Sequence, residues 1–472
     1  FRTGIILKNA KARRHINQLQ IILFHIGLGF AANFSRSLMK IYVPLVFLFF
    51  LRRIIVAQKK DREVLFAAAY FAGAEVFFRM TKALVFYETG KYAVMFFLVL
   101  GMFYQGFKRS AFPYVIYILL LIPGVFVAMN TLGFDANFRT EITFNLSGPL
   151  SLSIAALYCY GRKIRFREML SLMDVMIYPL IAMTIYVFLY TPDRSLDTIA
   201  TTSASNPALS GGYGPNQVST ALGLGVFLLY TRFLIPYKNK WVHFVMMFFL
   251  VAMAYRALLT FSRGGVFTAI IMAGVFTVII YAVTSLKTKS KVTLKLLGTL
   301  GVTVGIWFFT LIQTGGMLGN RYENKDSLGR EKEDITTGRL DLFLAEYKAF
   351  TDSPVFGIGV GKTKSYHEEL LGTSLPTHNE ISRMISEHGL FGIIALMILL
   401  CAPTLTKLQG RKNVYFYPFM LFWFLTVFHS SMRIAAPGFV YGLSLLSLVY
   451  TTHDQKKKKT SSLPRQQALP QR

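Results

Sequence analysis

Apolar stretches of 17 residues or more recur along the whole chain, and this feature limits the possible folds more than any other. Lipid offers the backbone no hydrogen-bond partners, so each stretch must close its own hydrogen bonds as a helix. The candidate spans are residues 18–34, 40–57, 63–79, 91–107, 111–130, 147–161, 171–190, 216–236, 241–260, 264–286, 293–314, 388–407, 414–430 and 434–451. We therefore expect an all-α polytopic membrane protein with about 12 to 14 transmembrane helices.

Basic residues gather in every second loop between these spans. The net charge of +28 is spread over loops that border the membrane, so it does not indicate a nucleic-acid partner. By the positive-inside rule these loops and both termini are cytoplasmic. Contact with anionic lipid is the alternative reason for their charge. The basic loops are residues 52–60, 108–109, 161–167, 238–240, 287–291, 411–412 and 456–459.

The predicted topology divides the chain into four parts. Residues 1–314 form transmembrane helices with short loops, and residues 388–452 form the C-terminal transmembrane helices. Between them, residues 315–387 form one large outer loop with short helices and the main polar motifs. Residues 453–472 are a basic tail that we expect to be disordered. The two cysteines lie within or beside spans, so no disulfide framework is expected.

Residues Thr377 to Glu380 have the pattern of a capping box at the start of a helix. In such a box His378 occupies the first helical position, where the positive end of the helix dipole disfavours a charged imidazole. A neutral imidazole can take a proton from a hydroxyl group. A lone histidine is usually structural, but this one lies on the same predicted side of the membrane as Arg263. We therefore interpret His378 as a candidate catalytic base.

Arg256 and Arg263 lie seven residues apart at the outer end of a predicted span, and would share one face of a continuous helix. An arginine in an apolar span is costly unless it meets an anion, a carbonyl or water, and its planar fork suits phosphate oxygens. Gly264 and Gly265 leave space beside Arg263, so we interpret Arg263 as an anion-binding residue. For Arg256, a side chain that reaches out to water is the simpler explanation.

Two further outer segments carry candidate contacts. The apolar residues between 340 and 350 have the spacing of an amphipathic helix that stops before Pro354 and could lie in the membrane interface. Arg339 at its start is a second possible phosphate contact. Residues 211–216, GGYGPN, allow a sharp turn before Asn216 caps the next span. Either this is only a flexible loop with a helix cap, or it lines the substrate and Tyr213 stacks on a sugar.

Other patterns are weaker. Glu75 and Arg79 lie four apart in a span, so they could pair on one helical face or serve a function there. The GIGVGKT run at residues 357–363 resembles a phosphate-binding loop, but Phe356 stands where glycine is needed and no βαβ unit surrounds it. We expect a tight turn instead. The histidines have no zinc-site spacing, and no metal site is expected.

In this order the motifs resemble those of the O-antigen ligases. His378 and Asn379, followed after nine residues by Gly389 and after two more by Gly392, are similar to the HN-x9-G-x2-G signature of these enzymes. The motifs at Arg263, Arg339 and 211–216 are similar to other landmarks of the wider O-antigen ligase and polymerase family. The resemblance implies a GT-C-like membrane glycosyltransferase in which His378 is catalytic and Arg263 contacts pyrophosphate. The further candidate substrate contacts are Arg339, Arg256, Asn379, Tyr213 and Asn216.

The resemblance also implies a reaction and its partners. O-antigen ligases transfer a preassembled glycan from undecaprenyl pyrophosphate to a lipid A-core sugar at the periplasmic face of the bacterial inner membrane, with no metal, nucleotide or other cofactor. The expected partners are therefore the lipid-linked donor, the lipid A-core acceptor and membrane lipids. A polymerase or an O-oligosaccharyltransferase with the same donor is the nearest alternative. A transporter is the distant one.

Overall fold

The computed structural model describes residues 2–57, 60–84, 86–133, 137–191, 203–332, 336, 338–372, 377–410, 412–429 and 432–450. The predicted disordered tail, residues 453–472, lies outside these ranges, as do Thr337, Pro376 and most of the loop before residue 203.

Helices make up nearly all of the described chain. The longer helices are α1 (Arg2–Phe34), α2 (Arg36–Val56), α3 (Lys60–Met80), α4 (Thr89–Gln105), α5 (Pro113–Thr131), α6 (Phe138–Cys159), α7 (Phe166–Tyr190), α9 (Pro215–Leu234), α10 (Lys240–Leu259), α11 (Arg263–Val283), α12 (Leu286–Gln313), α14 (Arg339–Asp352), α16 (Glu380–Leu408), α17 (Phe416–Val427) and α18 (Ala435–Ser444). Shorter elements are η1 (Arg109–Ala111), η3 (Pro207–Ser210), α13 (Met317–Tyr322) and α15 (Thr363–Leu371), with two strands, β1 (Lys163–Arg165) and β2 (Ser447–Val449).

This architecture confirms an all-α polytopic membrane protein. In the described ranges, eight helices are long and apolar enough to cross a membrane by length and composition, namely α5, α6, α7, α9, α10, α11, α12 and α16. Each of the fourteen predicted spans contains a helix. Several of the others are short or carry charges, such as α17 with 12 residues. The count of 12 to 14 spans and the GT-C-like fold stay predictions.

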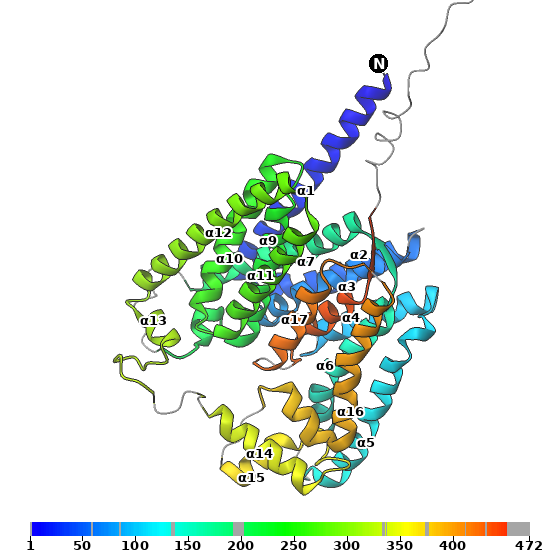
Figure 1. The fold of residues 1–472 in the computed structure, drawn as a ribbon, viewed down its shortest axis with the longest axis vertical. Helices are drawn as coiled ribbons and strands as arrows, with labels where there is room; N and C mark the ends of the chain where they lie inside the picture. The colour runs from blue at the N-terminus through cyan, green and yellow to red at the C-terminus, as the bar shows by residue number, and fades with distance from the viewer. Residues whose placement is uncertain are drawn as a thin grey trace, which may run out of the picture.

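The helices pack into two groups that share α6, α17 and α18 (Figure 1). In the larger group α3 packs on α4 and α7, and α9 packs on α10 and α11. In the smaller group α16 packs on α5, and α6 lies against α18. The short helices α14 and α15 lie beside the start of α16, at the end of the smaller group (Figure 1). The start of α9 lies next to the end of α17, because the side-chain amide of Asn216 donates to the carbonyl of His429 at 3.1 Å.

Two glycines shape α16. Gly389 has φ 58° and ψ −135°, so the helix bends there, and the Leu390 N–H donates to the carbonyl of Pro354 at 2.8 Å. A side chain at Gly389 would lie 2.6 Å from that carbonyl oxygen, so only glycine fits. At Gly392 there is no room for a side chain because the carbonyl of Met384 lies against it. The glycines of the ligase-like signature are therefore needed for the path of the helix.

The predicted tight turn at residues 357–363 is confirmed. Gly357, Gly359 and Gly361 all have positive φ, between 72° and 96°. The loop lies against both helices of the smaller group, because Val360 N–H donates to α5 at Gly124 and Gly361 N–H donates to Glu387 of α16. It therefore supports the bend of α16 rather than a nucleotide.

The last predicted span, 434–451, is only partly helical. α18 ends at Ser444, and residues 447–449 form β2, which pairs in parallel with β1. Asn413 causes this early end, because its side-chain amide donates to the carbonyls of Leu443, Ser444 and Leu446 at 3.0 to 3.1 Å. These bonds satisfy the open end of the helix.

Candidate active site

Residues 377–380 begin α16 differently from the predicted capping box. The helix starts at Glu380, and Asn379 is its N-cap, whose side-chain oxygen accepts from the Ile381 N–H at 3.0 Å. Thr377 instead accepts from the N–H of Asn379 at 3.2 Å. The prediction that His378 occupies the first helical turn is therefore wrong, because asparagine caps a helix better than threonine. His378 lies in the loop before α16, and Asn379 caps that helix.

His378 is nevertheless kept neutral. Burial lowers the pKa of His378 from 6.5 to about 4, and repulsion by Arg433, Arg339 and His429 adds to this effect. At pH 7 the ring is therefore uncharged, and one of its nitrogens has a lone pair that can accept a proton. The expected property is present, but burial and neighbouring cations cause it rather than a helix dipole.

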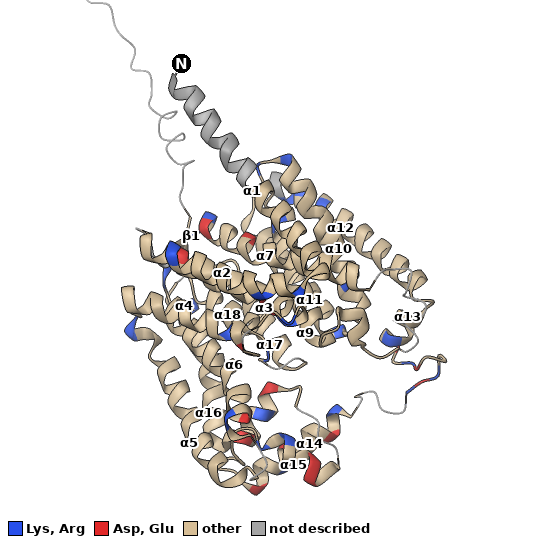
Figure 2. Cartoon of the chain, turned by 180° about the vertical axis from the view of Figure 1, so that it is seen from behind, with Lys and Arg blue, Asp and Glu red and all other residues tan. Residues whose placement is uncertain are grey.

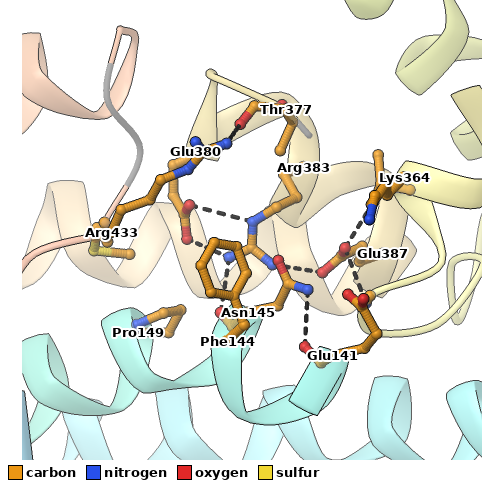
Figure 3. Close-up of a pocket in the computed structure, with 13 residues that line it drawn as sticks. Glu141, Phe144, Asn145, Pro149, Lys364, Thr377, Glu380, Arg383, Glu387 and Arg433 are labelled. Carbon is orange, nitrogen blue, oxygen red and sulfur yellow. Dashed lines mark hydrogen bonds and ion pairs between the residues drawn. The ribbon is translucent and has the colours of Figure 1, made fainter. Parts of the chain in front are cut away.

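Arg433 reaches this loop from the far end of the chain. It lies between α17 and α18, and its Nη2 donates a hydrogen bond of 2.5 Å to the carbonyl of Thr377 (Figure 3). Its guanidinium carbon lies 5.8 Å from the centre of the Phe144 ring. Arg433 is not among the candidate residues that the sequence predicts. The signal that could have found it is a basic residue in a loop of the predicted outer side, where the positive-inside rule leaves few.

A tight turn places Arg263 at the start of a helix of its own. α10 ends at Leu259 and α11 begins at Arg263, with Phe261 between them in the left-handed conformation at φ 54°. A bulky residue rarely adopts this conformation, so the turn is strained, as backbone near functional sites often is. The expectation that Arg256 and Arg263 share one face of a continuous helix is therefore wrong.

Arg256 belongs to the scaffold. Its side chain is fully buried, donates to the carbonyl of Thr191 at 2.7 Å and lies 4.0 Å from the centre of the Phe188 ring. Thr191 ends α7, so Arg256 satisfies the open end of a neighbouring helix. It does not reach out to water, as the simpler explanation expected, and the structure does not bring it to the site.

Three arginines gather around the turn before α11. Arg321 of α13 donates from Nε to the carbonyl of Phe261 at 2.9 Å. Burial lowers the pKa of Arg321, and repulsion by Arg263 and Arg339 lowers it further. Within the described ranges the guanidinium groups of Arg263 and Arg339 have no hydrogen-bond or ion-pair partner. Arg339 also repels His378, as Arg433 does, and we call Arg263, Arg321, Arg339 and Arg433 the open arginine cluster.

Asn216 links the start of α9 to two loops of the site. Its side-chain oxygen accepts from the Ser262 hydroxyl at 2.9 Å, and its amide donates to the His429 carbonyl at 3.1 Å. α9 begins at Pro215, so Asn216 lies in its first turn and is not the predicted cap. Because both ends of the amide bind the protein, Asn216 holds the residue before Arg263 in place.

Tyr213 joins a buried ionic network. Its hydroxyl accepts from Arg79 at 3.0 Å and lies 3.1 Å from the hydroxyl of Tyr87. Arg79 pairs with Glu75 at 2.5 Å, as the four-residue spacing predicted, and with Glu88 at 3.1 Å. The hydroxyl of Tyr213 therefore serves the network, and the stacking of its ring on a sugar stays a prediction.

A small polar cavity lies beside the His378 loop, between α6 and the start of α16 (Figure 3). Its volume is about 40 Å³, which suits a few water molecules and is too small for a sugar ring. In its wall Arg383 pairs with Glu380 and with Glu387, the latter at 2.5 Å. Within the described residues, no group of three or more His, Cys, Asp or Glu side chains could hold a metal ion.

The predicted amphipathic helix is α14. One face packs on α16, where Ser382 donates to the buried carboxylate of Glu346. The opposite face is apolar and exposed. Figure 2 shows that charged residues are sparse over the long helices and gather around α14, α15 and the start of α16. The exposed apolar residues of α14 are Leu340, Phe343, Leu344 and Tyr347.

One comparison with known proteins identifies a family. Residues 248–397 match the model of a family described as O-antigen ligase, whose members are glycosyltransferase-like enzymes. No curated protein matches the chain. The matched segment includes His378 and three residues of the open arginine cluster, and Arg433 lies beyond it. With its matched segment set among long apolar helices, the chain is a multi-pass membrane protein in which residues 248–397 are similar to the O-antigen ligase family.

Proposed function

We propose that the protein is an O-antigen ligase of the bacterial inner membrane. It transfers a preassembled glycan from undecaprenyl pyrophosphate to a sugar hydroxyl of the lipid A core, at the periplasmic face. The observation that supports this best is a neutral imidazole at His378 beside arginines that pair with no carboxylate within the described residues. Such a site offers a proton acceptor and an anion-binding surface together, which are the two groups that this transfer needs.

In the proposed reaction the acceptor hydroxyl attacks the anomeric carbon of the first donor sugar. A carbon–oxygen bond to the acceptor forms, the bond to the pyrophosphate oxygen breaks, and undecaprenyl pyrophosphate leaves with the bonding electron pair. His378 accepts the hydroxyl proton, and general-base help of this kind contributes about 10²–10⁴-fold. The bound diphosphate offsets the charge of Arg339 and Arg433, which raises the pKa of His378 towards that of an effective base.

The open arginine cluster binds the diphosphate in this proposal. A guanidinium presents N–H donors in a plane that matches two phosphate oxygens, and the charge on the leaving group is then stabilised as it develops. Within the described ranges, the donors of Arg263 and Arg339 have no protein partner and could bind a ligand. Arg321 adds charge, and Asn216 fixes the turn that carries Arg263.

The polyprenyl chain needs an apolar path beside the site. The exposed apolar face of α14 starts directly after Arg339, so a helix lying in the membrane interface would hold lipid next to the cation that binds its diphosphate. α12 presents apolar side chains over nearly all of its length. Both surfaces suit a lipid-linked donor.

The direct test is His378→Ala in purified protein with lipid-linked donor and lipid A-core acceptor. We expect transfer to fall at least about 10²-fold, with an unchanged melting temperature in detergent. His243→Ala is the matched control, because His243 lies near the start of α10, at the end away from Arg263, and should keep full activity. Normal transfer by His378→Ala would refute the proposal.

Two other outcomes identify the alternatives. Extension of the donor by a second lipid-linked repeat, with no use of the core acceptor, would make the protein a polymerase. Flux of the donor across proteoliposomes without glycosidic bond formation would make it a transporter. Transfer to a protein hydroxyl would indicate an O-oligosaccharyltransferase.

A further inference from the structure

Arg433 lies 36 residues beyond the end of the matched segment, between α17 and α18. We propose that Arg433 holds the His378 loop in place and, with its remaining N–H groups, binds the diphosphate of the donor. This inference rests on the proposed function, and it adds to the site a residue from a part of the chain that the family model does not cover.

The tether acts on the backbone just before His378. A hydrogen bond from Arg433 Nη2 to the carbonyl of Thr377 joins two segments that lie 56 residues apart in the sequence. Thr377 directly precedes His378, and the helix begins only after its N-cap Asn379, so this hydrogen bond fixes the main chain next to the imidazole. Loss of the bond would leave His378 free to turn away from an acceptor hydroxyl.

Most N–H donors of the Arg433 guanidinium are available to a ligand within the described chain. Arginine carries five N–H donors, and only the bond to Thr377 uses one of those of Arg433 within the described chain. Glu380, the carboxylate that acts on Arg433, already pairs with Arg383. A half-buried guanidinium without a carboxylate is costly unless an anion or water meets it. A diphosphate supplies that anion.

The segment that carries Arg433 is itself held firmly. On one side the carbonyl of Met432 accepts from Lys91 at 3.4 Å, and on the other the N–H of Ala435 donates to Glu75 at 2.5 Å. Lys91 pairs with Glu88 at 2.6 Å, so both partners belong to the buried ionic network that Tyr213 joins. Arg433 is therefore presented from rigid backbone, as a group that positions other residues must be.

The position of Arg433 also has an effect on His378 that can be measured. The charged and titratable groups near His378 are Arg433, Arg339 and His429 from other elements, with Glu380 on the following helix. Since a like charge disfavours protonation, removal of Arg433 should raise the pKa of His378. The acid limb of the rate–pH profile should then move to higher pH.

The test compares Arg433→Gln and Arg433→Lys with the wild-type protein. For Arg433→Gln we expect kcat/KM to fall about 10²-fold, inhibition by inorganic pyrophosphate to weaken about tenfold, and the acid limb to rise by about one pH unit. Arg433→Lys keeps the charge and loses the fork, so the acid limb should stay in place while kcat/KM remains low. Arg330→Gln, at an exposed residue of the loop before α14, is the matched control.

Each result decides the inference. An unchanged acid limb and unchanged pyrophosphate inhibition in Arg433→Gln would overturn it, and if that variant fails to fold, wild-type kcat/KM in Arg433→Lys would do the same. Full transfer by Arg433→Gln with none by His378→Ala would reject only the role of Arg433. Full transfer by His378→Ala would reject the proposed function itself.

Discussion

Two groups of cations lie close together in this protein and differ in one respect. In the buried ionic network of Glu75, Arg79, Glu88 and Lys91, both cations pair with carboxylates, Arg79 with two of them and Lys91 with Glu88 at 2.6 Å. In the open arginine cluster no member pairs with a carboxylate within the described ranges. One group is neutral as a whole, and the other carries a charge of the same sign on every member.

This difference separates scaffold from site. Charges that satisfy one another bind helices together and have little left for a ligand, whereas repelling charges are kept only where something else compensates them. The network joins α3 and α4 to the start of α18. Arg256 joins α10 to the end of α7 through a backbone carbonyl. Within the described ranges, the side chains of the open cluster donate only to the backbone carbonyls of Phe261 and Thr377, and no carboxylate there offsets their repulsion. This is the environment that the anionic donor proposed above would complete.

The largest effect should come from breaking the network. Arg79→Met leaves the buried carboxylate of Glu75 without the guanidinium that pairs with it, and we expect a loss of about 3–5 kcal/mol of stability. The measurement is the melting temperature and the folded yield in detergent. Arg79→Met combined with Glu75→Gln removes the uncompensated charge and should recover a large part of the loss. If Arg79→Met alone were as stable as the wild type, the network would contribute nothing to the stability of the scaffold.

The next largest effect should be a loss of activity without a loss of stability. Arg263→Gln removes a donor fork from the open cluster, and we expect kcat/KM to drop about 10²–10³-fold. The melting temperature should stay the same or rise, because Arg321 and Arg339 lose a repelling neighbour. Arg263→Lys keeps the charge but should also fail, since a point charge does not bind two oxygens at once. Full transfer by Arg263→Lys would exclude a bidentate contact, and a large fall in stability would move Arg263 to the scaffold.

The sequence was enough to predict where the helices lie in the chain, but not which residues of other elements their side chains contact. Apolar length identified a helix in each predicted span, and the apolar spacing after Arg339 predicted α14 because both follow from local periodicity. The pairing of Glu75 with Arg79 was predictable for the same reason, since both lie on one helix. The roles of Arg256 and Asn216 were not, because their partners belong to other helices and to loops distant in the chain.

Two errors have local physical causes. Thr377 fitted a capping box, but Asn379 is the stronger cap two residues later, so the helix starts there. Arg256 and Arg263 fitted one helix, but Phe261 takes a positive φ that few bulky residues adopt, and no sequence pattern signals it. Arg433 was missed because its contact with Thr377 exists only in the folded protein.

A smaller, pH-dependent effect should come from Glu346, a buried carboxylate with no arginine or lysine partner among the described residues. Burial raises the pKa of Glu346 to about 7, and its nearest basic group is His367, with Nε2 3.5 Å away. A folded-state pKa above the unfolded value of 4.5 stabilises the α14–α16 contact fully below pH 4.5, and this is lost as pH rises through about 7. Limited proteolysis of α14 should be about tenfold faster at pH 8 than at pH 5.

Glu346→Gln separates this effect from ordinary loop motion. Glutamine stays neutral and can still accept from Ser382, so the pH dependence of cleavage should disappear while the helix stays packed. Cleavage of the variant that still accelerates with pH would assign the dependence to another group. Such a result would leave Glu346 as a carboxylate that is satisfied by its hydrogen bonds at every pH.

The smallest effect should come from an ion pair that is exposed to solvent, in contrast to the buried ionic network. Arg330 pairs with Asp326 at 2.8 Å, with 72% of its side chain exposed, in the loop that leads from Arg321 to Arg339. Solvent screens such a pair, so Arg330→Gln should change neither the melting temperature nor kcat/KM. A fall in kcat/KM that vanishes at high salt would mean that a diffuse positive surface attracts the donor. The open arginine cluster would then attract the donor through its overall charge rather than through direct hydrogen bonds to phosphate oxygens. In that case Arg263→Lys would be expected to retain transfer activity.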